Sequence, residues 1–247
     1  MADPGYIDLH CHLLPAVDDG AKSVEESVAM ARALAAAGFA AVAPSPHAWP
    51  ENPSAAAIAE KREALARRLA AEGIALELHP NAENRLDPEL FDRIERDDAR
   101  PLGAGRYLLV EAPFDAPLPR LPELLFRLRV KGFTPIVAHP ERCLEFAERP
   151  ERAREAAEAG AALQAELGAL LGRYGPKAKK LCERFLDEGL YAMAASDLHG
   201  PVGADRWLPE AILALRRRVG AEATGRLLAE NPARALRGED LVRPEAG

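Results

Sequence analysis

Asp8-Leu9-His10-Cys11-His12 is the stretch that decides the fold prediction. It follows Tyr6-Ile7, and this order indicates a short apolar strand that ends in polar residues. Side chains alternate between the two faces of an extended strand, so His10 and His12 point to the same face. Asp8 either joins them or lies behind them. Two imidazoles on one face at a strand end can bind a divalent metal, although a His-x-His pair alone is weak evidence.

Composition and charge limit the classes of protein to which the chain can belong. Its 247 residues are 48% hydrophobic, which allows a sizeable core. No linker rich in Pro, Gly or Ser divides the chain, so we expect a single domain over residues 1–247. The formal net charge of -7 argues against a nucleic-acid binder or a protein of acidic membrane surfaces.

The cellular compartment is predicted from the cysteines and the apolar runs. There are three widely spaced cysteines without a C-x-x-C motif, which fits a reducing compartment. The N-terminus lacks the basic and apolar regions of a signal peptide, and no apolar run is long enough to span a bilayer. We therefore expect a cytoplasmic protein without membrane insertion.

Strand and helix patterns alternate about seven times along the chain. Ser23 and Glu26 form a capping-box pattern at the start of the first helix, and Gly38 is placed to end it. Strands are expected at residues 39–43, 74–78, 107–110, 134–138, 161–165 and 191–195, with helices between them. Such alternation predicts parallel strands with right-handed crossovers, as in a closed (β/α) barrel with its active site at the carboxyl rim. An open doubly wound sheet is the alternative, although a nucleotide-binding version would need a glycine-rich motif that this sequence lacks.

Side chains that can bind metals gather at the ends of the predicted strands. Of the six histidines, all except His79 lie there or in the turns that follow. With four carboxylates they make nine candidate donors: His10, His12, Asp19, His47, Glu83, Glu111, His139, Asp197 and His199. Any one of these acids alone is more often a solvated or helix-capping residue. Together they exceed what one ion needs, so we expect two or three ions that share carboxylates, and the donors suit Mn, Fe or Zn better than Ca or Mg. Such a centre lowers the pKa of water and neutralises charge on phosphate oxygens, which is the chemistry of hydrolysis.

Motifs spread in order over nearly the whole chain resemble those of the PHP (polymerase and histidinol phosphatase) superfamily. They are the segment from Asp8 to Gly20, Pro44-Ser-Pro-His47, Asn81-Ala-Glu83, Leu109-Val-Glu111, Ala138-His-Pro-Glu-Arg142, Leu170-Leu-Gly172 and Ser196-Asp-Leu-His199. Within the superfamily the sequence resembles the bacterial manganese-dependent tyrosine-protein phosphatases of capsule and exopolysaccharide gene clusters. The Asp18-Asp19-Gly20 ending of the first motif is specific to that branch. The resemblance implies an α/β fold, a distorted (β/α)7 barrel of TIM type.

The resemblance also implies a metal centre with three divalent transition-metal ions, Mn²⁺ in first place and Fe or Zn as alternatives. It assigns the ligands to three groups: His10, His12 and Asp197; Glu83 as a bridge to an ion held by Glu111 and His139; and Asp19, His47 and His199. Arg142 and Arg206 resemble family arginines that meet phosphate, for which a guanidinium fork is suited. A surface salt bridge is the alternative role for each arginine.

The implied activity is hydrolysis of phosphotyrosine, with the tail of a bacterial tyrosine kinase that regulates polysaccharide synthesis or export as partner. A histidinol-phosphate-type phosphatase and a non-catalytic phosphotyrosine-binding module are the alternatives. The sequence departs from the family at Ala48, where His is frequent, and at Gln164-Ala-Glu166, where Gln-x-Asn is usual. Glu166 would add negative charge near the site.

A second phosphatase motif is present but is weak evidence for a second active site. Cys143 and Arg149 fit the C-x5-R spacing of cysteine-dependent tyrosine phosphatases. That chemistry needs free backbone N–H groups around the phosphate and a thiolate of lowered pKa. This segment has no glycine and carries Glu145 and Glu148, so we attribute the match to chance.

Overall fold

Parallel strands in sequential order form the centre of the molecule. The computed structural model describes residues 5–49, 52–103 and 105–243. Its strands lie in two sheets, and every pairing is parallel. The first sheet contains β1 (Tyr6–Asp8), β2 (Phe39–Val42) and β3 (Glu77–Leu78). The second contains β4 (Asn84–Arg85), β5 (Tyr107–Glu111), β6 (Thr134–Ala138), β7 (Ala162–Glu166) and β8 (Tyr191–Ala195).

Two bridges connect the sheets just beyond the carboxyl ends of β1, β2 and β8, and one of them involves Glu83, which leads directly into β4. Isolated parallel bridges join Cys11 to Leu198 and His47 to Glu83. At the first bridge the N–H of His12 donates to the carbonyl oxygen of Leu198 at 3.0 Å. Within the described ranges no continuous ladder joins the two sheets, so the closed barrel expected from the sequence is not observed and only these two isolated bridges connect the sheets. Predicted metal ligands lie at or next to both bridges.

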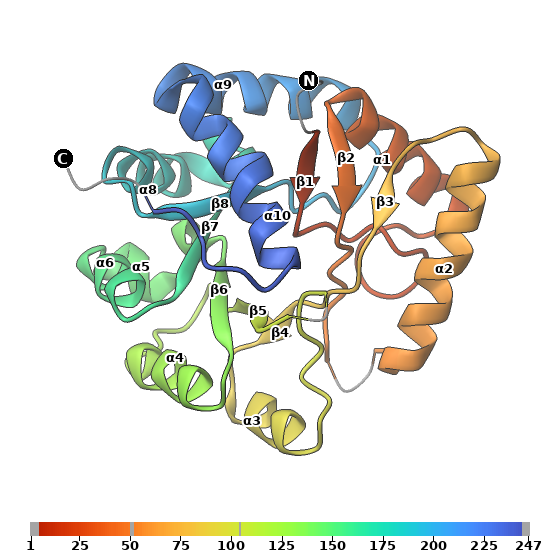
Figure 1. The fold of residues 1–247 in the computed structure, drawn as a ribbon. Coiled ribbons are helices and arrows are strands. Elements are labelled where there is room, and N and C mark those ends of the chain that lie inside the picture. Colours follow the sequence, from red (N-terminus) through yellow and green to blue (C-terminus); the bar gives the residue numbers. More distant parts are fainter. Residues whose placement is uncertain (1–4, 50–51, 104, 244–247) are drawn as a thin grey trace.

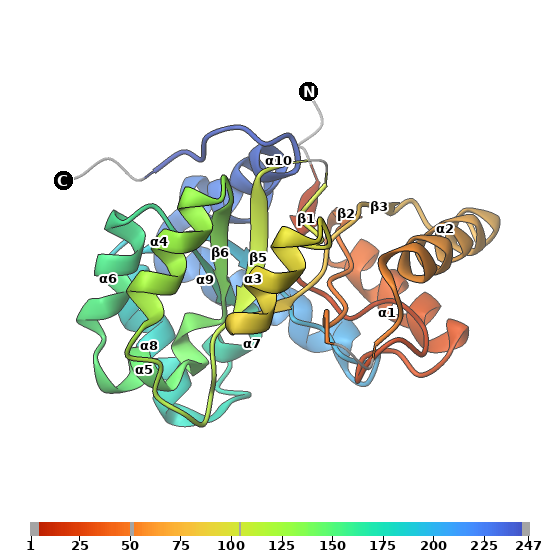
Figure 2. The same cartoon turned by 90° about the horizontal axis from the view of Figure 1, so that it is seen from below.

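Helices lie around the outside of the strands (Figure 1). They are α1 (Val24–Ala36), α2 (Ala55–Ala71), α3 (Pro88–Glu95), α4 (Leu121–Val130), α5 (Leu144–Glu148), α6 (Glu151–Glu158), α7 (Leu167–Leu170), α8 (Gly175–Asp187), α9 (Ala204–Gly225) and α10 (Asn231–Leu236). A 3₁₀ turn covers Pro140–Arg142, and a π-helix at Arg226–Glu230 joins α9 to α10. The view from below shows α3 and α4 beside β5 and β6 (Figure 2). Within the described part of the chain, no helix is long and apolar enough to cross a membrane.

Capping explains where several helices begin. The Ser23 hydroxyl accepts a hydrogen bond from the N–H of Glu26 at 3.3 Å, which confirms the predicted start of α1. The Glu26 carboxylate accepts from the N–H of Lys22 at 2.7 Å, one residue earlier than in the usual box. Gly38 follows the helix with a φ of 98°, a conformation that costs glycine little.

The core has an outer and an inner part, because successive side chains along a buried strand point to opposite faces of the sheet. In β5, Leu108 and Val110 pack in the cluster that lies between strands and helices, whereas Leu109 belongs to a smaller cluster with Ile136 and Met193. The inner cluster fills the space between the strands. Because apolar side chains occupy the space between the strands, the polar residues that follow the strands lie at the carboxyl edge of the sheets.

Candidate metal centre

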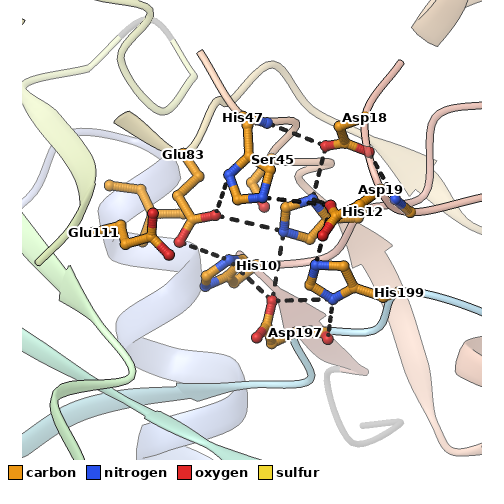
Figure 3. A network of polar contacts seen from close by, with 12 residues as sticks. His10, His12, Asp18, Asp19, Ser45, His47, Glu83, Glu111, Asp197 and His199 are labelled. Atoms are coloured by element: carbon orange, nitrogen blue, oxygen red, sulfur yellow. Dashed lines mark hydrogen bonds and ion pairs between the residues drawn. The ribbon is translucent and has the colours of Figure 1, made fainter. Parts of the chain in front are cut away.

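All nine predicted ligands lie together at the carboxyl rim, and Figure 3 shows most of them pointing toward a common centre. Seven follow or end strands β1, β3, β5, β6 and β8, while His47 follows β2 and Asp19 lies in the loop before α1. The clustering predicted from strand ends is therefore observed.

Glu83 lies among four imidazoles. Its carboxylate oxygens are 3.0 Å from His47 Nδ1, 3.1 Å from His139 Nε2, 3.3 Å from His10 Nε2 and 3.5 Å from His12 Nε2. The side chain is only 1% exposed. Each oxygen of this buried carboxylate faces two imidazole nitrogens, which is the arrangement expected of a carboxylate that bridges two ions.

Asp197 is a second central carboxylate. Its Oδ1 lies 3.2 Å from His10 Nε2, 3.5 Å from His12 Nε2 and 3.5 Å from His199 Nδ1. Its Oδ2 accepts a hydrogen bond from Nη1 of Arg142 at 2.8 Å. The cluster therefore contains two carboxylates that can be shared between ions.

The donor atoms fall into four overlapping groups, and within each group the atoms lie within 4.8 Å of one another. The groups are His12, Asp19, His47 and His199; His10, His12 and Glu83; His10, His139 and Asp197; and His47, Glu83 and Glu111. The first contains the whole Asp19–His47–His199 set implied by the resemblance. Glu111 groups with His47 rather than His139, although its Oε1 is also 3.9 Å from His139 Nε2.

Unpartnered polar atoms show that these residues fit metal ions. Five buried atoms of the cluster form no well-aligned hydrogen bond with any described residue, even though four of them lie 3.0–3.5 Å from opposite groups of the cluster: Nε2 of His10 and His12, Nδ1 of His47 and His139, and Oδ1 of Asp197. A buried polar atom without a partner costs about 1–3 kcal/mol. Coordination of an ion would satisfy these atoms, and imidazole with carboxylate is a donor set for transition metals.

Polar residues behind the cluster fix the orientation of its histidines. The Nδ1 atom of His12 lies 2.7 Å from the Asp18 carboxylate, and that of His10 lies 3.1 Å from Oε1 of Gln164. Each contact directs Nε2 to the centre of the cluster. Asp18 and Gln164 were not predicted to contact the ligands, although both belong to segments singled out from the sequence.

Asp8 lies behind the cluster and is not among its ligand groups. Its carboxylate accepts hydrogen bonds from the N–H of His10 at 3.2 Å and of Ser196 at 3.1 Å. It thereby ties the end of β1 to the end of β8. Burial raises its pKa to about 6, while the hydrogen bonds from Ser196 oppose that rise.

Two of the predicted ligands have a backbone conformation that is rare outside glycine. His139 has a φ of 31° and Asp197 a φ of 50°, both in the left-handed region. Such a conformation costs about 1–3 kcal/mol, and it occurs where the surroundings require it. His139 directly follows β6 and Asp197 follows β8 after Ser196, and each turn directs the side chain to the centre.

Proton affinities reflect the crowding of charges in the metal-free cluster. Burial alone would lower the pKa of His47, but the carboxylates of Asp19 and Glu83 raise it to about 9. Burial and the neighbouring Glu83 carboxylate raise the pKa of Glu111 to about 7. Burial would raise the pKa of Glu83, yet His10 and the other imidazoles hold it well below its usual range. Cations are thus favoured at the centre of the cluster.

A cavity of about 290 Å³ opens above the cluster. Aromatic side chains form part of its walls: the Trp49 ring stacks on His47 at 4.2 Å between centroids, and the Phe114 ring lies 5.0 Å from that of His139. Arg142 also lines the cavity. The site thus combines a floor of candidate metal ligands, apolar ring faces and a guanidinium.

The family follows from comparison with known proteins. The model of the family described as "Capsular polysaccharide synthesis, CpsB/CapC" matches residues 6–237. This chain belongs to the CpsB/CapC family.

Named members of the CpsB/CapC family align over nearly their whole length. Tyrosine-protein phosphatase YwqE of Bacillus subtilis is 35% identical over 242 residues, which cover 96% of this chain and 94% of YwqE. Tyrosine-protein phosphatase CpsB of Streptococcus pneumoniae is 25% identical, with 93% of this chain and 98% of CpsB covered.

Solved structures support the same placement. A crystal structure from the pair YwqE and CpsB, described as unique metal-dependent tyrosine phosphatases, has a TM-score of 0.89 at 33% identity and covers 96% of this chain and 97% of the other. The phosphotriesterase homology protein of Escherichia coli has a TM-score of 0.63 at 13% identity, covering 95% and 99%, which shows a shared fold alone. The predicted α/β fold is thereby confirmed.

The two arginines implied by the resemblance lie in different surroundings. Nη1 of Arg142 donates to Glu166 at 3.0 Å as well as to Asp197, and the guanidinium lies 4.3 Å from the ring centroids of both Phe114 and Tyr174. Burial and the neighbouring Asp197 raise the pKa of Glu166 well above its usual range, and the guanidinium of Arg142 opposes that rise. Arg206 is exposed in the first turn of α9 and does not line this cavity, so the structure does not bring it together with the nine ligands.

The C-x5-R segment lacks the features of a cysteine phosphatase site in this CpsB/CapC family member. Cys143 is buried, and burial raises the pKa of its thiol. Arg149 pairs with Glu145 at 3.2 Å. A protonated thiol beside an acid cannot serve as an anionic nucleophile toward phosphate.

Proposed function

We propose that the protein is a metal-dependent tyrosine-protein phosphatase that hydrolyses phosphotyrosine monoesters. The observation that carries the proposal is the set of nine imidazoles and carboxylates at the floor of a cavity lined by Arg142. The near full-length similarity to YwqE and CpsB, which are named tyrosine-protein phosphatases, supports the substrate class.

The proposed cofactor is a set of three divalent transition-metal ions, with Mn²⁺ first and Fe or Zn as alternatives. Asp19, His47 and His199 with His12 would hold one ion, while Glu83 and Asp197 are the carboxylates best placed to be shared. When bound, such ions lower the pKa of water and stabilise negative charge on phosphate oxygens.

Arg142 is proposed to bind the phosphate group. Both of its hydrogen bonds to described residues are made by Nη1, so Nε and Nη2 can form a bidentate pair with phosphate oxygens. Glu166 and Asp197 fix the guanidinium from behind. Phe114 and Trp49 offer ring faces for a tyrosyl side chain. We retain Arg206 as a weaker proposal, since reaching phosphate would require its exposed side chain to turn toward the cavity.

The proposed partner is the phosphotyrosine tail of a bacterial tyrosine kinase in polysaccharide synthesis or export, encountered in the cytoplasm. The description of the matching family as one of capsular polysaccharide synthesis supports this setting. We further propose that residues 1–247 act as a single domain, since the ligands derive from segments spread over most of the chain.

A comparison of substrates tests the proposal. We expect kcat/KM of the metal-loaded protein to be clearly higher for a phosphotyrosyl peptide than for a phosphoseryl peptide or histidinol phosphate. A preference for histidinol phosphate would assign the protein to the small-molecule phosphatases. Binding of the phosphotyrosyl peptide without turnover of any aryl phosphate would make it a non-catalytic module.

A further inference from the structure

A second cavity of about 430 Å³ adjoins the metal centre and has no role in the mechanism above. It shares Asp19, Arg142, Asp197 and His199 with the first cavity, so the two are continuous across the rim. Its remaining wall includes Arg173, Tyr174 and Trp207. The surface therefore continues from the phosphate position into a pocket with one further cation and two aromatic rings.

The turn after α7 places this cation at the rim. Gly172 has a φ of 75°, and the N–H of Arg173 donates to the carbonyl oxygen of Gly168 at 3.2 Å. A Cβ added at Gly168 would lie 3.1 Å from Cδ of Arg173 and 3.1 Å from Cε2 of Tyr174. The Leu170-Leu171-Gly172 motif, for which the sequence gave no function, thus directs Arg173 and Tyr174 to the pocket.

Arg173 has no carboxylate partner among the described residues, in contrast to Arg142. Its guanidinium lies 4.6 Å from the centroid of the Trp207 ring, which holds it by a cation–π contact. The Asp19 carboxylate lines the same pocket but lies 3.4 Å from imidazole nitrogens of both His47 and His199. An anion that enters the pocket therefore meets an unpaired cation.

We propose that this pocket binds an acidic side chain next to the phosphotyrosine in a peptide substrate, with Arg173 as the residue that selects it. The inference rests on the proposed phosphatase function. With the phosphotyrosine in the first cavity, an extended peptide advances about 3.3–3.6 Å per residue, so a neighbouring side chain reaches the second cavity. Because the whole protein carries a net charge of -7, such an acid needs a local cation at the rim.

The test uses the full-length, metal-loaded protein and phosphotyrosyl peptides. Glu and its neutral isostere Gln are compared at each of the three positions on either side of the phosphotyrosine, with p-nitrophenyl phosphate as a substrate without flanking residues. Arg173→Ala and Arg173→Glu are measured beside wild type. Arg217→Ala is the matched control, since Arg217 is an exposed arginine of α9 that lines neither cavity.

We expect Glu at one position to raise kcat/KM about fivefold over Gln in wild type and Arg217→Ala, as for an ion pair at a partly open surface. Arg173→Ala should abolish this ratio, Arg173→Glu should reverse it so that Gln is preferred over Glu at that position, and salt should weaken the wild-type preference. Hydrolysis without any preference for Glu, or a preference that persists in Arg173→Ala, would overturn this inference and leave the proposed phosphatase function intact. An equal loss with p-nitrophenyl phosphate would also overturn it, because Arg173 would then contact the phosphate. If wild type hydrolysed neither peptide nor p-nitrophenyl phosphate, the proposed function would fail and the inference with it.

Discussion

Oδ2 of Asp18 lies 2.7 Å from Nδ1 of His12, and both side chains are almost completely buried. The same carboxylate oxygen accepts a hydrogen bond from the N–H of His47 at 3.1 Å. Asp18 thus positions two histidines of the cluster without belonging to any of the ligand groups. A metal-binding imidazole usually donates its other N–H to such an acceptor, which fixes its tautomer and its orientation.

Asp18→Asn should therefore weaken metal binding by about 10–100-fold while leaving the nine ligands in place. Activity should be lost at low metal concentration and largely return when metal is added in excess. His12→Ala, which removes a ligand atom, should not be rescued in this way. Metal titrations of activity in both variants check the difference, and equal behaviour of the two would argue against a purely orienting role of Asp18.

Replacement of ligands and of the buried thiol should have opposite results. His139→Ala and Asp197→Ala are expected to reduce kcat by several orders of magnitude, because each removes a donor from the cluster. Cys143→Ser should keep most of the activity, since this thiol lies outside the cavity. An inactive Cys143→Ser protein together with active ligand variants would reverse the assignment of the mechanism.

The two arginines should differ in their effect on turnover. Arg142→Ala is expected to lower kcat/KM by about 10²–10³, the effect typical of removing a donor to the developing charge. Arg142→Lys should lose less of kcat/KM than Arg142→Ala but should remain below wild type, because an ammonium cannot form the bidentate pair. Arg206→Ala should lower kcat/KM by much less than Arg142→Ala, because the exposed Arg206 side chain lies outside the cavity and would have to turn toward it to reach phosphate. Steady-state kinetics with a phosphotyrosyl peptide measure all three.

Metal affinity should rise with pH. The pKa of His47 in the metal-free protein is raised from its ordinary value of 6.5 to about 9. This imidazole therefore keeps its proton up to about pH 9, whereas an ordinary imidazole loses it near pH 6.5. A metal ion must displace that proton, so binding near pH 7.5 should release protons and become tighter as the pH approaches 9. Calorimetry in buffers of different ionisation enthalpy counts the released protons. Binding that is independent of pH over this interval would contradict the assignment of His47 as a ligand.

Strong strand patterns allowed much of the fold to be predicted. Residues 134–138 and 191–195 were predicted as strands with the bounds that β6 and β8 have, because both are continuous apolar runs. The strand expected at residues 74–78 is reduced to Glu77–Leu78, and Asn84–Arg85 was missed. A two-residue strand has too little alternation to be recognised, and its pairing depends on neighbours distant in sequence.

The gathering of the nine ligands was also predictable, since parallel strands bring their carboxyl ends to one rim. The partners behind them were not, because contacts such as Gln164 with His10 join residues far apart in sequence. The exposure of Arg206 follows from helical phase. Ala204, Trp207 and Leu208 mark the buried face of α9, which leaves Arg206 on the opposite side. That phase was present in the sequence.

The central claim is that the nine-residue cluster is a metal centre required for hydrolysis. The most direct measurement is the metal content of the purified protein by elemental analysis, combined with activity on a phosphotyrosyl peptide before and after chelation. We expect two or three transition-metal ions per chain, loss of hydrolysis on chelation and recovery when Mn²⁺ is restored. Full activity in metal-stripped protein would contradict it.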